Sequence, residues 1–284
     1  MKIISYVKKS KTGLAMSDGK TWRDLAAADA SLPGDLSVLL RDKDWRKRLE
    51  TVFAKAPEMS LTGITYAPPF RTSEKILCVG LNYVDHVAES PYELPTYPAY
   101  FPRFSSTLVG HEQPILKPKV SDDFDYEAEL VAVIGSTARH VSKENALEHV
   151  AGYTIFNEAS VRNYQFKASQ WTMGKNFDNT GACGPVFVTA DELPPGATGL
   201  QISTKVNGQL EQNANTKDLI FNVATLISLA SEVLTLRPGD LLVTGTPSGV
   251  GMGKKPPKYL REGDVCEVEI EKIGVLRNVV RNEV

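Results

Sequence analysis

The stretch that most constrains the fold of this chain is residues 125–135, in which acidic residues lead into an apolar run. The β-branched residues of that run and the glycine that ends it predict a strand, and alternate side chains of a strand point to the same face. Asp125, Glu127 and Glu129 would then share one face. Carboxylates beside a buried core repel one another and resist desolvation unless a cation or tight hydrogen bonds offset their charge. A divalent cation with oxygen ligands is therefore our hypothesis, and a solvated strand edge is the alternative.

The composition describes an ordinary globular chain. It has 284 residues, 42% of them hydrophobic, which is enough to bury a large core in one big domain or two smaller ones. The formal net charge is only −2 and acids and bases are interspersed, so no basic stripe indicates nucleic acid and no polybasic cluster indicates anionic lipid. We therefore expect a small-molecule partner, with neither nucleic acid nor a membrane involved.

The expected compartment is the reducing cytoplasm. The apolar run at residues 1–7 is too short for a signal peptide, and no later stretch is long enough to cross a membrane. Cys78, Cys183 and Cys266 are odd in number, widely spaced and free of any Cys-x-x-Cys pattern. They predict neither a disulfide framework nor a zinc site.

Two domains are expected, a small β-rich N-terminal domain at residues 1–70 and a larger domain at residues 71–284. The paired prolines Pro68 and Pro69 hold the chain extended and deny it a helix, which is typical of a linker. The N-terminal part opens with short strands separated by Lys-Thr-Gly and Asp-Gly turns, and two helical stretches follow. In the larger part the hydrophobic patterns predict strands at residues 75–79, 151–156, 201–206, 240–243, 264–270 and 275–280, and helices at residues 81–91, 143–149 and 221–234.

His86 and Glu89 lie three residues apart on the first of these helices, a spacing that puts both on one helix face. A carboxylate there can hold one imidazole nitrogen, set the tautomer and leave the other nitrogen free to take a proton from water. The alternative is a surface ion pair at a fraying helix end.

Two further charged residues lie where they could join a metal site. Glu158 follows an apolar strand, the position from which another carboxylate could reach the same cation. Lys175 is flanked by aromatic residues and by Gly174, a setting in which a partly buried lysine can stabilise a developing anion. A lysine whose stem is buried and whose ammonium group stays in water is the alternative, and the spacing leaves it open.

The glycine-rich loop at residues 244–255 resembles a nucleotide-binding loop in composition, but its sequence does not match the known nucleotide-binding motifs. A P-loop needs a glycine where Ser248 stands and a serine or threonine where Lys255 stands, and it must open a helix. Two prolines follow instead, and a dinucleotide fingerprint fails for the same lack of a helix. Glycines that let backbone amides approach a carboxylate or an enolate remain an open interpretation.

Taken together, these stretches resemble the fumarylacetoacetate hydrolase superfamily. Six motifs occur in the order of that family: Gly-x-Asn-Tyr-x-x-His-x-x-Glu at residues 80–89, Asp-Tyr-Glu-x-Glu-Leu at 125–130, Gly-Tyr-Thr at 152–154, Gly-Lys-x-Phe-Asp at 174–178, Val-Asn-Gly at 206–208 and Thr-Gly-Thr-Pro-x-Gly-Val-Gly at 244–251. Six motifs in order are specific, although each alone is weak. Residues 1–70 resemble more loosely the small N-terminal domain of many bacterial members. The resemblance implies an α+β fold with a mixed-sheet β-roll as the catalytic domain.

The resemblance also implies a metal site. It assigns Mg²⁺ or Mn²⁺ to Glu127, Glu129 and Glu158, and it makes Asp125 a supporting acid rather than a ligand. The chain departs from the commonest pattern at Glu158, where the family more often has aspartate. It departs again at Asn163, where an aspartate usually helps to orient the neighbouring arginine.

Further site residues follow from the same resemblance. His86 and Glu89 correspond to the family's catalytic pair, and Lys175 corresponds to its anion-stabilising lysine. Arg162, Gln165 and Thr246 correspond to its substrate-pocket groups. Arg103 and His111 lie outside the general pattern and are our candidates for substrate selection.

The implied reaction is metal-dependent hydrolysis of a C–C bond in a 2,4-dioxo acid, releasing pyruvate or a similar 2-oxo acid. Acylpyruvates, fumarylacetoacetate-like compounds and 2,4-diketo-3-deoxy sugar acids are the candidate substrates, with His86 activating the attacking water. An oxaloacetate-type decarboxylase or tautomerase on the same metal site is the alternative, because enolate chemistry without water gives those reactions. A non-catalytic nucleotide-binding module is an alternative of another class. A homodimer is expected from the family's habit and from the apolar helix at residues 221–234.

Overall fold

Residues 1–8, 10–88 and 93–284 are described by the computed structural model. The strands are β1 (Lys2–Lys8), β2 (Lys11–Ser17), β3 (Trp22–Asp24), β4 (Thr65–Tyr66), β5 (Ile76–Gly80), β6 (Ala99–Arg103), β7 (Leu108–Val109), β8 (Ile115–Lys117), β9 (Phe124–Asp125), β10 (Ala128–Ile134), β11 (Val150–Glu158), β12 (Ser160–Val161), β13 (Gly181–Cys183), β14 (Val186–Thr189), β15 (Gln201–Val206), β16 (Gln209–Asn215), β17 (Leu241–Val243), β18 (Val265–Ile270) and β19 (Gly274–Asn282). The α-helices are α1 (Leu25–Ala28), α2 (Leu36–Leu39), α3 (Trp45–Phe53), α4 (Val84–Ala88), α5 (Arg162–Gln165), α6 (Thr172–Lys175) and α7 (Val223–Val233). Short 3₁₀ helices are η1 (Ser105–Thr107), η2 (Ala146–His149), η3 (Ala190–Glu192), η4 (Pro195–Ala197), η5 (Thr216–Asp218) and η6 (Gly251–Gly253).

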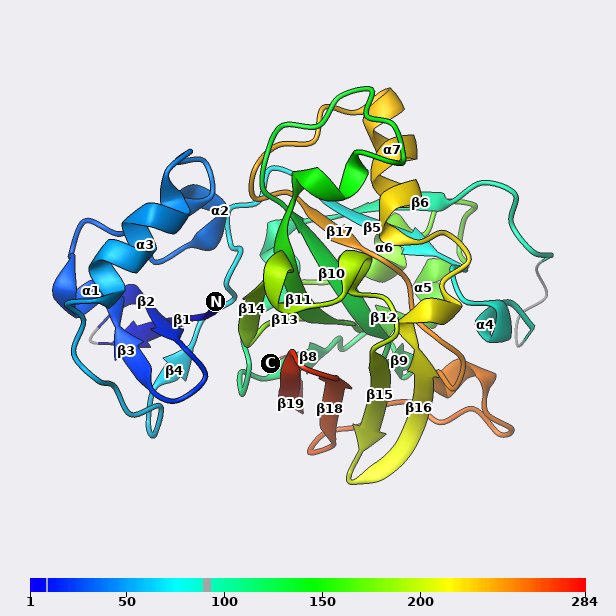
Figure 1. Cartoon of the computed structure of the whole chain (residues 1–284). Helices are drawn as coiled ribbons and strands as arrows, with labels where there is room; N and C mark the ends of the chain where they lie inside the picture. The colour runs from blue at the N-terminus through cyan, green and yellow to red at the C-terminus, as the bar shows by residue number, and fades with distance from the viewer. Residues whose placement is uncertain (9, 89–92) are drawn as a thin grey trace.

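A large mixed sheet runs through the middle of the molecule (Figure 1). Along its main path the strands follow the order β3-β2-β1-β14-β11-β10-β17-β5-β6. β10 pairs antiparallel with β11 and β17, whereas β17 pairs parallel with β5. Every residue of β10 and β11 is buried, which matches the continuous apolar runs of these strands, because a strand covered on both faces has no polar side. The expected α+β fold with a mixed sheet is confirmed.

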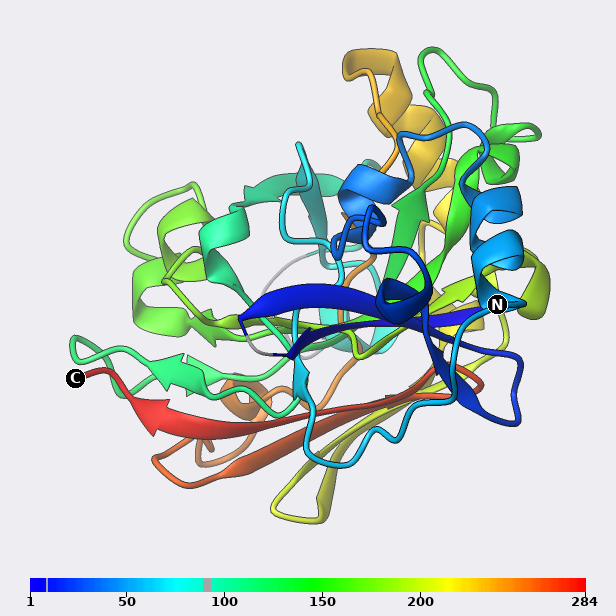
Figure 2. The ribbon, with the colours of Figure 1, turned by 90° about the vertical axis from the view of Figure 1, so that its left-hand side faces the viewer.

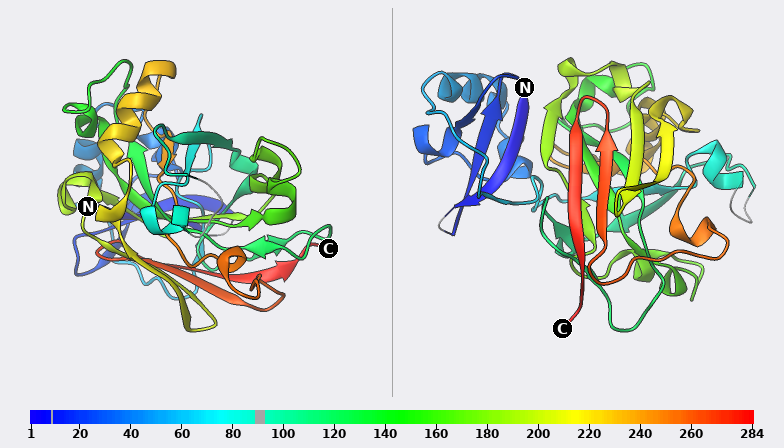
Figure 3. Two further views of the ribbon diagram at one scale, coloured as in Figure 1. Left: turned by 90° about the vertical axis from the view of Figure 1, so that its right-hand side faces the viewer. Right: turned by 90° about the horizontal axis from the view of Figure 1, so that it is seen from below.

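A second sheet of order β16-β15-β18-β19-β8 packs across the first, as the view from below shows (Figure 3). Buried residues of both sheets share one hydrophobic cluster, among them Leu130, Ile155, Ile202 and Val268. The β15–β16 hairpin turns at residues 207–208, whose φ angles are +52° and +79°. Asparagine and glycine adopt such angles readily, so the hairpin expected from the Asn-Gly pair is confirmed.

The N-terminal strands extend the large sheet rather than forming a sheet of their own. β1 pairs antiparallel with β14, with Ile3 opposite Phe187, and the β1–β2 hairpin is seen in blue in Figure 2. Leu36 and Leu49 from α2 and α3 belong to the same hydrophobic cluster as Val131 of β10. The division at residue 70 stays a prediction, but the first seventy residues share both hydrogen bonds and core with the rest.

The prediction of one continuous strand at residues 125–135 is wrong. β9 ends at Asp125 and pairs with β12 in a separate small sheet, whereas β10 begins at Ala128. The chain departs from the strand because the Asp125 carboxylate accepts hydrogen bonds from the N–H groups of Tyr126 and Gly251. Asp125 is accordingly not part of the carboxylate group that the two following glutamates join.

The predicted helices differ from the observed ones mainly at their ends. The segment at residues 143–149 forms only the 3₁₀ helix η2, and α4 begins at Val84. Residues 89–92 at its end lie outside the described residues. α7 matches the prediction closely and is capped by Asn222, whose side chain accepts the N–H of Thr225 at 3.0 Å.

Candidate active site

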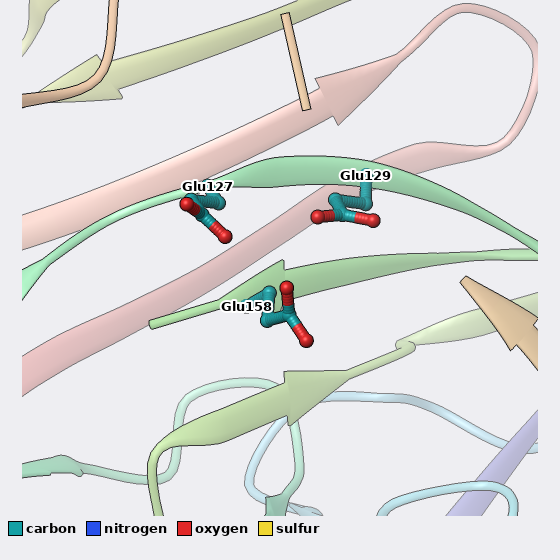
Figure 4. A group of neighbouring side chains, drawn as sticks. All are labelled: Glu127, Glu129 and Glu158. Carbon is teal, nitrogen blue, oxygen red and sulfur yellow. The ribbon is translucent and has the colours of Figure 1, made fainter. Parts of the chain in front are cut away.

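Three buried glutamates face one another beside two neighbouring strands (Figure 4). Glu127 directly precedes β10, Glu129 lies in β10 and Glu158 ends β11. The N–H of Glu158 donates to the carbonyl of Glu127 at 2.9 Å, so the strands bring the three carboxylates together. One oxygen of each lies within 4.8 Å of the others, and none of the three residues is more than 3% exposed. The structure thus assembles the trio that the resemblance implies.

Two cations partly balance this cluster. Lys175 Nζ lies 2.5 Å from Glu127 Oε2 and 2.9 Å from Glu158 Oε2. Arg162 Nη1 lies 2.6 Å from Glu127 Oε1. Burial acts to raise the pKa of Glu127, but Arg162 and Lys175 together hold that pKa below its usual range. Burial likewise acts to lower the pKa of Lys175, and the neighbouring glutamates nonetheless raise it. Both Glu127 and Lys175 are therefore charged at neutral pH.

Glu129 is the member of the cluster whose protonated form is favoured. Its carboxylate accepts the N–H of Gly245 at 2.6 Å. Burial, Glu158 and Glu127 raise its pKa well above the usual range. In addition, Oε1 of Glu158 has no hydrogen-bond partner within the described part of the chain. A divalent cation would replace that proton and satisfy that oxygen, so the three carboxylates fit Mg²⁺ or Mn²⁺, which prefer oxygen ligands.

Asp125 supports the cluster from outside it. Its Oδ2 accepts Nε–H of Arg162 at 2.8 Å, and its Oδ1 accepts the N–H of Gly251 at 2.7 Å. Arg162 also donates from Nη1 to Gln165 Oε1 at 2.9 Å. Asp125 thus fixes the arginine that contacts Glu127, which agrees with the supporting role expected for it.

Asn163, which stands where the family usually has an aspartate, makes its side-chain hydrogen bond away from Arg162. Its Oδ1 accepts the hydroxyl of Ser121 at 2.7 Å. The neighbouring guanidinium is instead oriented by Asp125, an acid more distant in sequence.

Arg103 lies beside Glu158 but does not line the cavity described below. Its Nη1 is 3.6 Å from Glu158 Oε1, and its other nitrogens donate to Thr107 Oγ1 at 3.2 Å and Thr180 Oγ1 at 2.6 Å. The alternation of β6 turns this side chain inward, so its expected direct contact with substrate is not supported.

His111 lies apart from the glutamates. Its Nδ1 accepts the N–H of Arg277 at 3.0 Å, and its ring packs edge-on against Tyr66 with centroids 4.7 Å apart. It is absent from the cavity lining, so the expectation that it selects substrate is also not supported.

His86 lies on α4, is 9% exposed and faces the cavity. Burial lowers its pKa to about 4; Arg162 and Lys175 act in the same direction, whereas Glu127 opposes them. Its Nδ1 has no hydrogen-bond partner among the residues that the structure describes. Glu89, its expected partner, lies outside the described residues. The imidazole is therefore neutral near pH 7 and can accept a proton.

A cavity of about 320 Å³ opens beside the glutamates, a size at the lower end of the range for small-molecule sites. Its lining is formed by Val79, Gly80, Leu81, His86, Glu127, Glu129, Glu158, Arg162, Gln165, Phe166, Trp171, Lys175, Thr246 and Met252. Apart from Glu89, Arg103 and His111, the catalytic, metal and substrate-pocket residues expected from the sequence therefore meet around one space. Carboxylates, two cations and a neutral base beside an apolar wall suit proton transfer on a small anion.

Trp171 is the cavity residue whose importance the sequence analysis missed. Its ring packs on Gly80, where an added Cβ would lie 2.1 Å from Trp171 Cζ3. The ring also meets Phe101 edge-on, with centroids 5.6 Å apart. A glycine at the end of an apolar strand was the available signal, because such a glycine often marks a close approach.

The glycine loop uses its backbone amides on carboxylates of the chain itself. Gly245 N–H binds Glu129, while Gly251 and Met252 N–H bind Asp125 at 2.7 Å and 3.0 Å. Amides committed in this way are not free to bind phosphate, which counts against the nucleotide-binding alternative.

The structure also bears on the expectations from composition. Cys78, Cys183 and Cys266 are buried and free, as the absence of a pairing pattern predicted. Within residues 1–8, 10–88 and 93–284, no helix is long and apolar enough to span a membrane.

Comparison with known sequences identifies relatives over most of the chain. The family model described as "Fumarylacetoacetate (FAA) hydrolase C-terminal" matches residues 75–281. A Xenopus laevis protein named "Oxaloacetate tautomerase fahd2, mitochondrial" is 39% identical over 274 residues, covering 95% of this chain and 86% of that protein.

Solved structures agree with this assignment. Fumarylacetoacetate hydrolase from Exiguobacterium antarcticum superposes with a TM-score of 0.87 at 32% identity, and all of both chains is covered. Maleylpyruvate hydrolase from Sphingobium sp. SYK-6, solved in complex with a manganese(II) ion and pyruvate, gives a TM-score of 0.82 at 28% identity, again over all of both chains. On the family match and these relatives together, this protein belongs to the fumarylacetoacetate hydrolase family.

Proposed function

We propose that this protein is a divalent-metal-dependent enzyme that interconverts the keto and enol forms of oxaloacetate or a close dicarboxylic analogue. The observation that carries the proposal is the buried trio Glu127, Glu129 and Glu158 facing one small cavity with a neutral His86 and a charged Lys175. The name of the Xenopus laevis relative, an oxaloacetate tautomerase, supports this choice among the reactions considered.

The chemistry of these groups suits a proton transfer. A divalent cation, Mg²⁺ or Mn²⁺, held by the three glutamates would polarise the oxygens of a 2-oxo acid and acidify the hydrogens of the neighbouring carbon. His86 would take one of those protons, because its imidazole is neutral. Lys175 would donate a hydrogen bond to the oxygen on which charge develops. Return of the proton to that oxygen gives the enol, and the reverse sequence gives the keto form.

The charge of the site supports an anionic substrate. Its buried acids are Asp125, Glu127, Glu129 and Glu158, and its buried cations are Arg103, Arg162 and Lys175. With every carboxylate ionised, these side chains carry one net negative charge, and a divalent cation turns it into one net positive charge. Arg162, Gln165 and Thr246 line the same cavity and would hold the carboxylates of the substrate.

Hydrolytic C–C cleavage of a 2,4-dioxo acid is the second candidate. A specific observation favours it: Nδ1 of His86 is buried and, among the described residues, unpartnered, as a base for a water molecule would be. The similarity to a maleylpyruvate hydrolase solved with manganese and pyruvate points the same way. The same pocket would then have to admit a longer substrate and a water.

One set of assays tests the proposal. The Mn²⁺-loaded protein should speed the decay of the ultraviolet absorbance of enol-oxaloacetate, and EDTA should abolish the effect. Parallel assays follow CO₂ from oxaloacetate and pyruvate from acylpyruvates. Pyruvate release from an acylpyruvate without tautomerase activity would replace the proposal by the second candidate, and CO₂ release as the main reaction would indicate a decarboxylase.

We also propose a homodimer in a reducing compartment, with the cytoplasm as first choice. Large apolar side chains such as Leu94, Phe104 and Met173 are 54–69% exposed and are available for contact with a second copy. The buried free cysteines support a reducing environment. Light scattering coupled to gel filtration tests the dimer, and a monomeric mass at micromolar concentration would reject it.

A further inference from the structure

Gln212 of β16 makes four hydrogen bonds through its buried side-chain amide. It is 1% exposed and stands opposite Thr204 of β15 in the hairpin register. Its Oε1 accepts the N–H of Ala128 at 3.0 Å and the hydroxyl of Thr204 at 2.7 Å. Its Nε2 donates to Thr246 Oγ1 at 2.8 Å and to the carbonyl of Pro247 at 2.9 Å. Every donor and acceptor of the amide is thus used.

Two of these partners fix which way the amide faces. The backbone N–H of Ala128 can only donate, so the amide oxygen must face it. The carbonyl of Pro247 can only accept, so the amide nitrogen must face it. The orientation therefore follows from chemistry rather than from the assignment of similar atoms.

The fixed amide influences whether the Thr246 hydroxyl donates or accepts a hydrogen bond. Because Nε2 of Gln212 donates to Thr246 Oγ1, the hydroxyl oxygen acts as an acceptor on that side. The structure gives the Thr246 hydroxyl no acceptor within the residues it describes. Thr246 lines the cavity beside the glutamates, so its O–H can donate into that space.

We propose that Gln212 is a positioning residue that makes Thr246 a hydrogen-bond donor to a carboxylate oxygen of the substrate. This inference rests on the proposed function and deepens it, because it says how the cavity distinguishes an anionic group from a neutral donor group. A hydroxyl free to rotate can turn either its hydrogen or a lone pair to the ligand. The amide of Gln212 occupies one of the two lone pairs and keeps the hydrogen from turning toward Nε2, which favours pointing the hydrogen to the other sides, the cavity among them. Selection for an anion is then a property of a residue that does not line the cavity itself.

A competing explanation of the role of Gln212 follows from the position of Ala128 and must be excluded. This residue lies between Glu127 and Glu129, so Gln212 could instead act by holding the backbone that carries the metal ligands. The two routes differ in their readouts. Action through Thr246 changes anion affinity and leaves metal affinity alone, whereas action through Ala128 changes both.

The test measures oxalate, a non-reacting dianion, binding to the Mn²⁺-loaded protein by calorimetry, with Mn²⁺ affinity measured separately. Gln212→Glu replaces the donor by an acceptor that draws in the Thr246 hydrogen, and Gln212→Met removes the donor without adding charge. Loss of one hydrogen bond to a charged group corresponds to about a tenfold or greater loss of affinity. We expect that loss in both variants, with Mn²⁺ affinity within about twofold of wild type. If Gln212→Glu does not fold, Gln212→Met alone decides the question.

The Thr246→Val variant tests whether the Gln212 substitutions act through the Thr246 hydroxyl. It should lose oxalate affinity to the same degree, and adding either Gln212 substitution to it should cost no more than about another twofold. Thr246→Ser keeps the hydroxyl and should bind nearly as wild type. Gln201→Glu is the matched control, because this glutamine of the same hairpin is exposed and its side-chain amide donates only to Asn213 Oδ1 among the described residues.

Several outcomes overturn the inference. The first is that the Gln212 substitutions reduce oxalate affinity as much in the Thr246→Val background as in the wild type. The second is that they reduce Mn²⁺ affinity in parallel. The third is that the wild-type protein does not bind oxalate. Since oxalate binding needs no turnover, a protein that binds oxalate without tautomerase activity would fail the proposed function but still test the inference.

Discussion

Arg103 lies 3.6 Å from Glu158, Nη1 to Oε1, and neither side chain is more than 1% exposed. The arginine is held in place by two threonine hydroxyls and by the carbonyl of Ala159. It therefore serves as a fixed positive charge beside the Glu158 carboxylate. Within the described residues, Oε1 of that carboxylate has no hydrogen-bond partner.

Arg103→Met should destabilise the metal-free protein strongly and the metal-loaded protein less. Removing one partner of a buried ion pair costs about 3 to 5 kcal/mol, because the other charge stays buried. A bound cation offsets the charge of Glu158 and reduces that cost. Denaturant unfolding in EDTA and in Mn²⁺ measures both values. Arg281→Met is the control, since its pair with Glu262 is exposed and worth less than about 1 kcal/mol; equal losses in the two conditions for Arg103→Met would contradict this account.

Mn²⁺ affinity should rise with pH because the cation competes with a proton on Glu129. Burial and the neighbouring glutamates raise the pKa of Glu129, so its protonated form is favoured in the folded, metal-free protein. Below that raised pKa, affinity should gain up to about tenfold for each pH unit, and binding should release a proton. Calorimetry in buffers of different ionisation enthalpy measures that release.

Glu129→Gln should bind Mn²⁺ weakly and without this pH dependence, whereas Glu269→Gln, on an exposed position of β18, should behave as wild type. Retention of tight, pH-dependent binding in Glu129→Gln would remove Glu129 from the ligand set.

His86→Ala should lower kcat by about 10² to 10⁴ and leave Mn²⁺ affinity nearly unchanged, since His86 is proposed as the base and not as a ligand. The pKa of His86 is about 4, so the basic form persists down to that pH. In a pH profile of kcat/KM at saturating Mn²⁺, the acid limb should therefore fall near or below pH 4 rather than near the usual pKa of 6.5. His140→Ala, at an exposed histidine, is the control. A limb between pH 6 and 7 that disappears in His86→Ala would show that the imidazole is less buried during turnover.

Gly80→Ala should raise KM about tenfold or more without loss of Mn²⁺. The new methyl group would lie 2.1 Å from Trp171 Cζ3, so the ring must move into the cavity that it lines. Overpacking of this kind costs about 1 to 3 kcal/mol. The double variant Gly80→Ala, Trp171→Leu should recover part of the affinity, because the smaller side chain leaves room. Steady-state kinetics measure both, and a normal KM in Gly80→Ala would mean that the ring relaxes without narrowing the site.

Local patterns predicted much of the fold because the interactions behind them are local. The Asn-Gly pair at residues 207–208 predicts its own hairpin, and the apolar spacing of α7 predicts its length within a residue or two at each end. The break between Asp125 and Ala128 could not be foreseen in the same way. It depends on Gly251 and Arg162, which are distant in sequence and reach Asp125 only in the folded chain.

The site residues also differ in whether local sequence patterns could predict their positions. Glu127, Glu129 and Glu158 could be predicted to meet, because a strand periodicity and a family motif specify where they point. Arg103 and His111 could not be placed, since their local context does not say toward which side chains they turn. Gln212 was missed because its strand is mostly polar, and nothing in that pattern distinguishes a buried amide from exposed ones.

The pairing of β1 with β14 covers one edge of the catalytic part of the sheet. β14 lies between β1 and β11, the strand that ends in Glu158. A chain without β1 would present the N–H and C=O groups of β14 as an open edge, and open edges recruit strands from other molecules. The N-terminal segment covers this edge, and we therefore expect a chain shortened by these residues to aggregate before it loses its glutamate cluster.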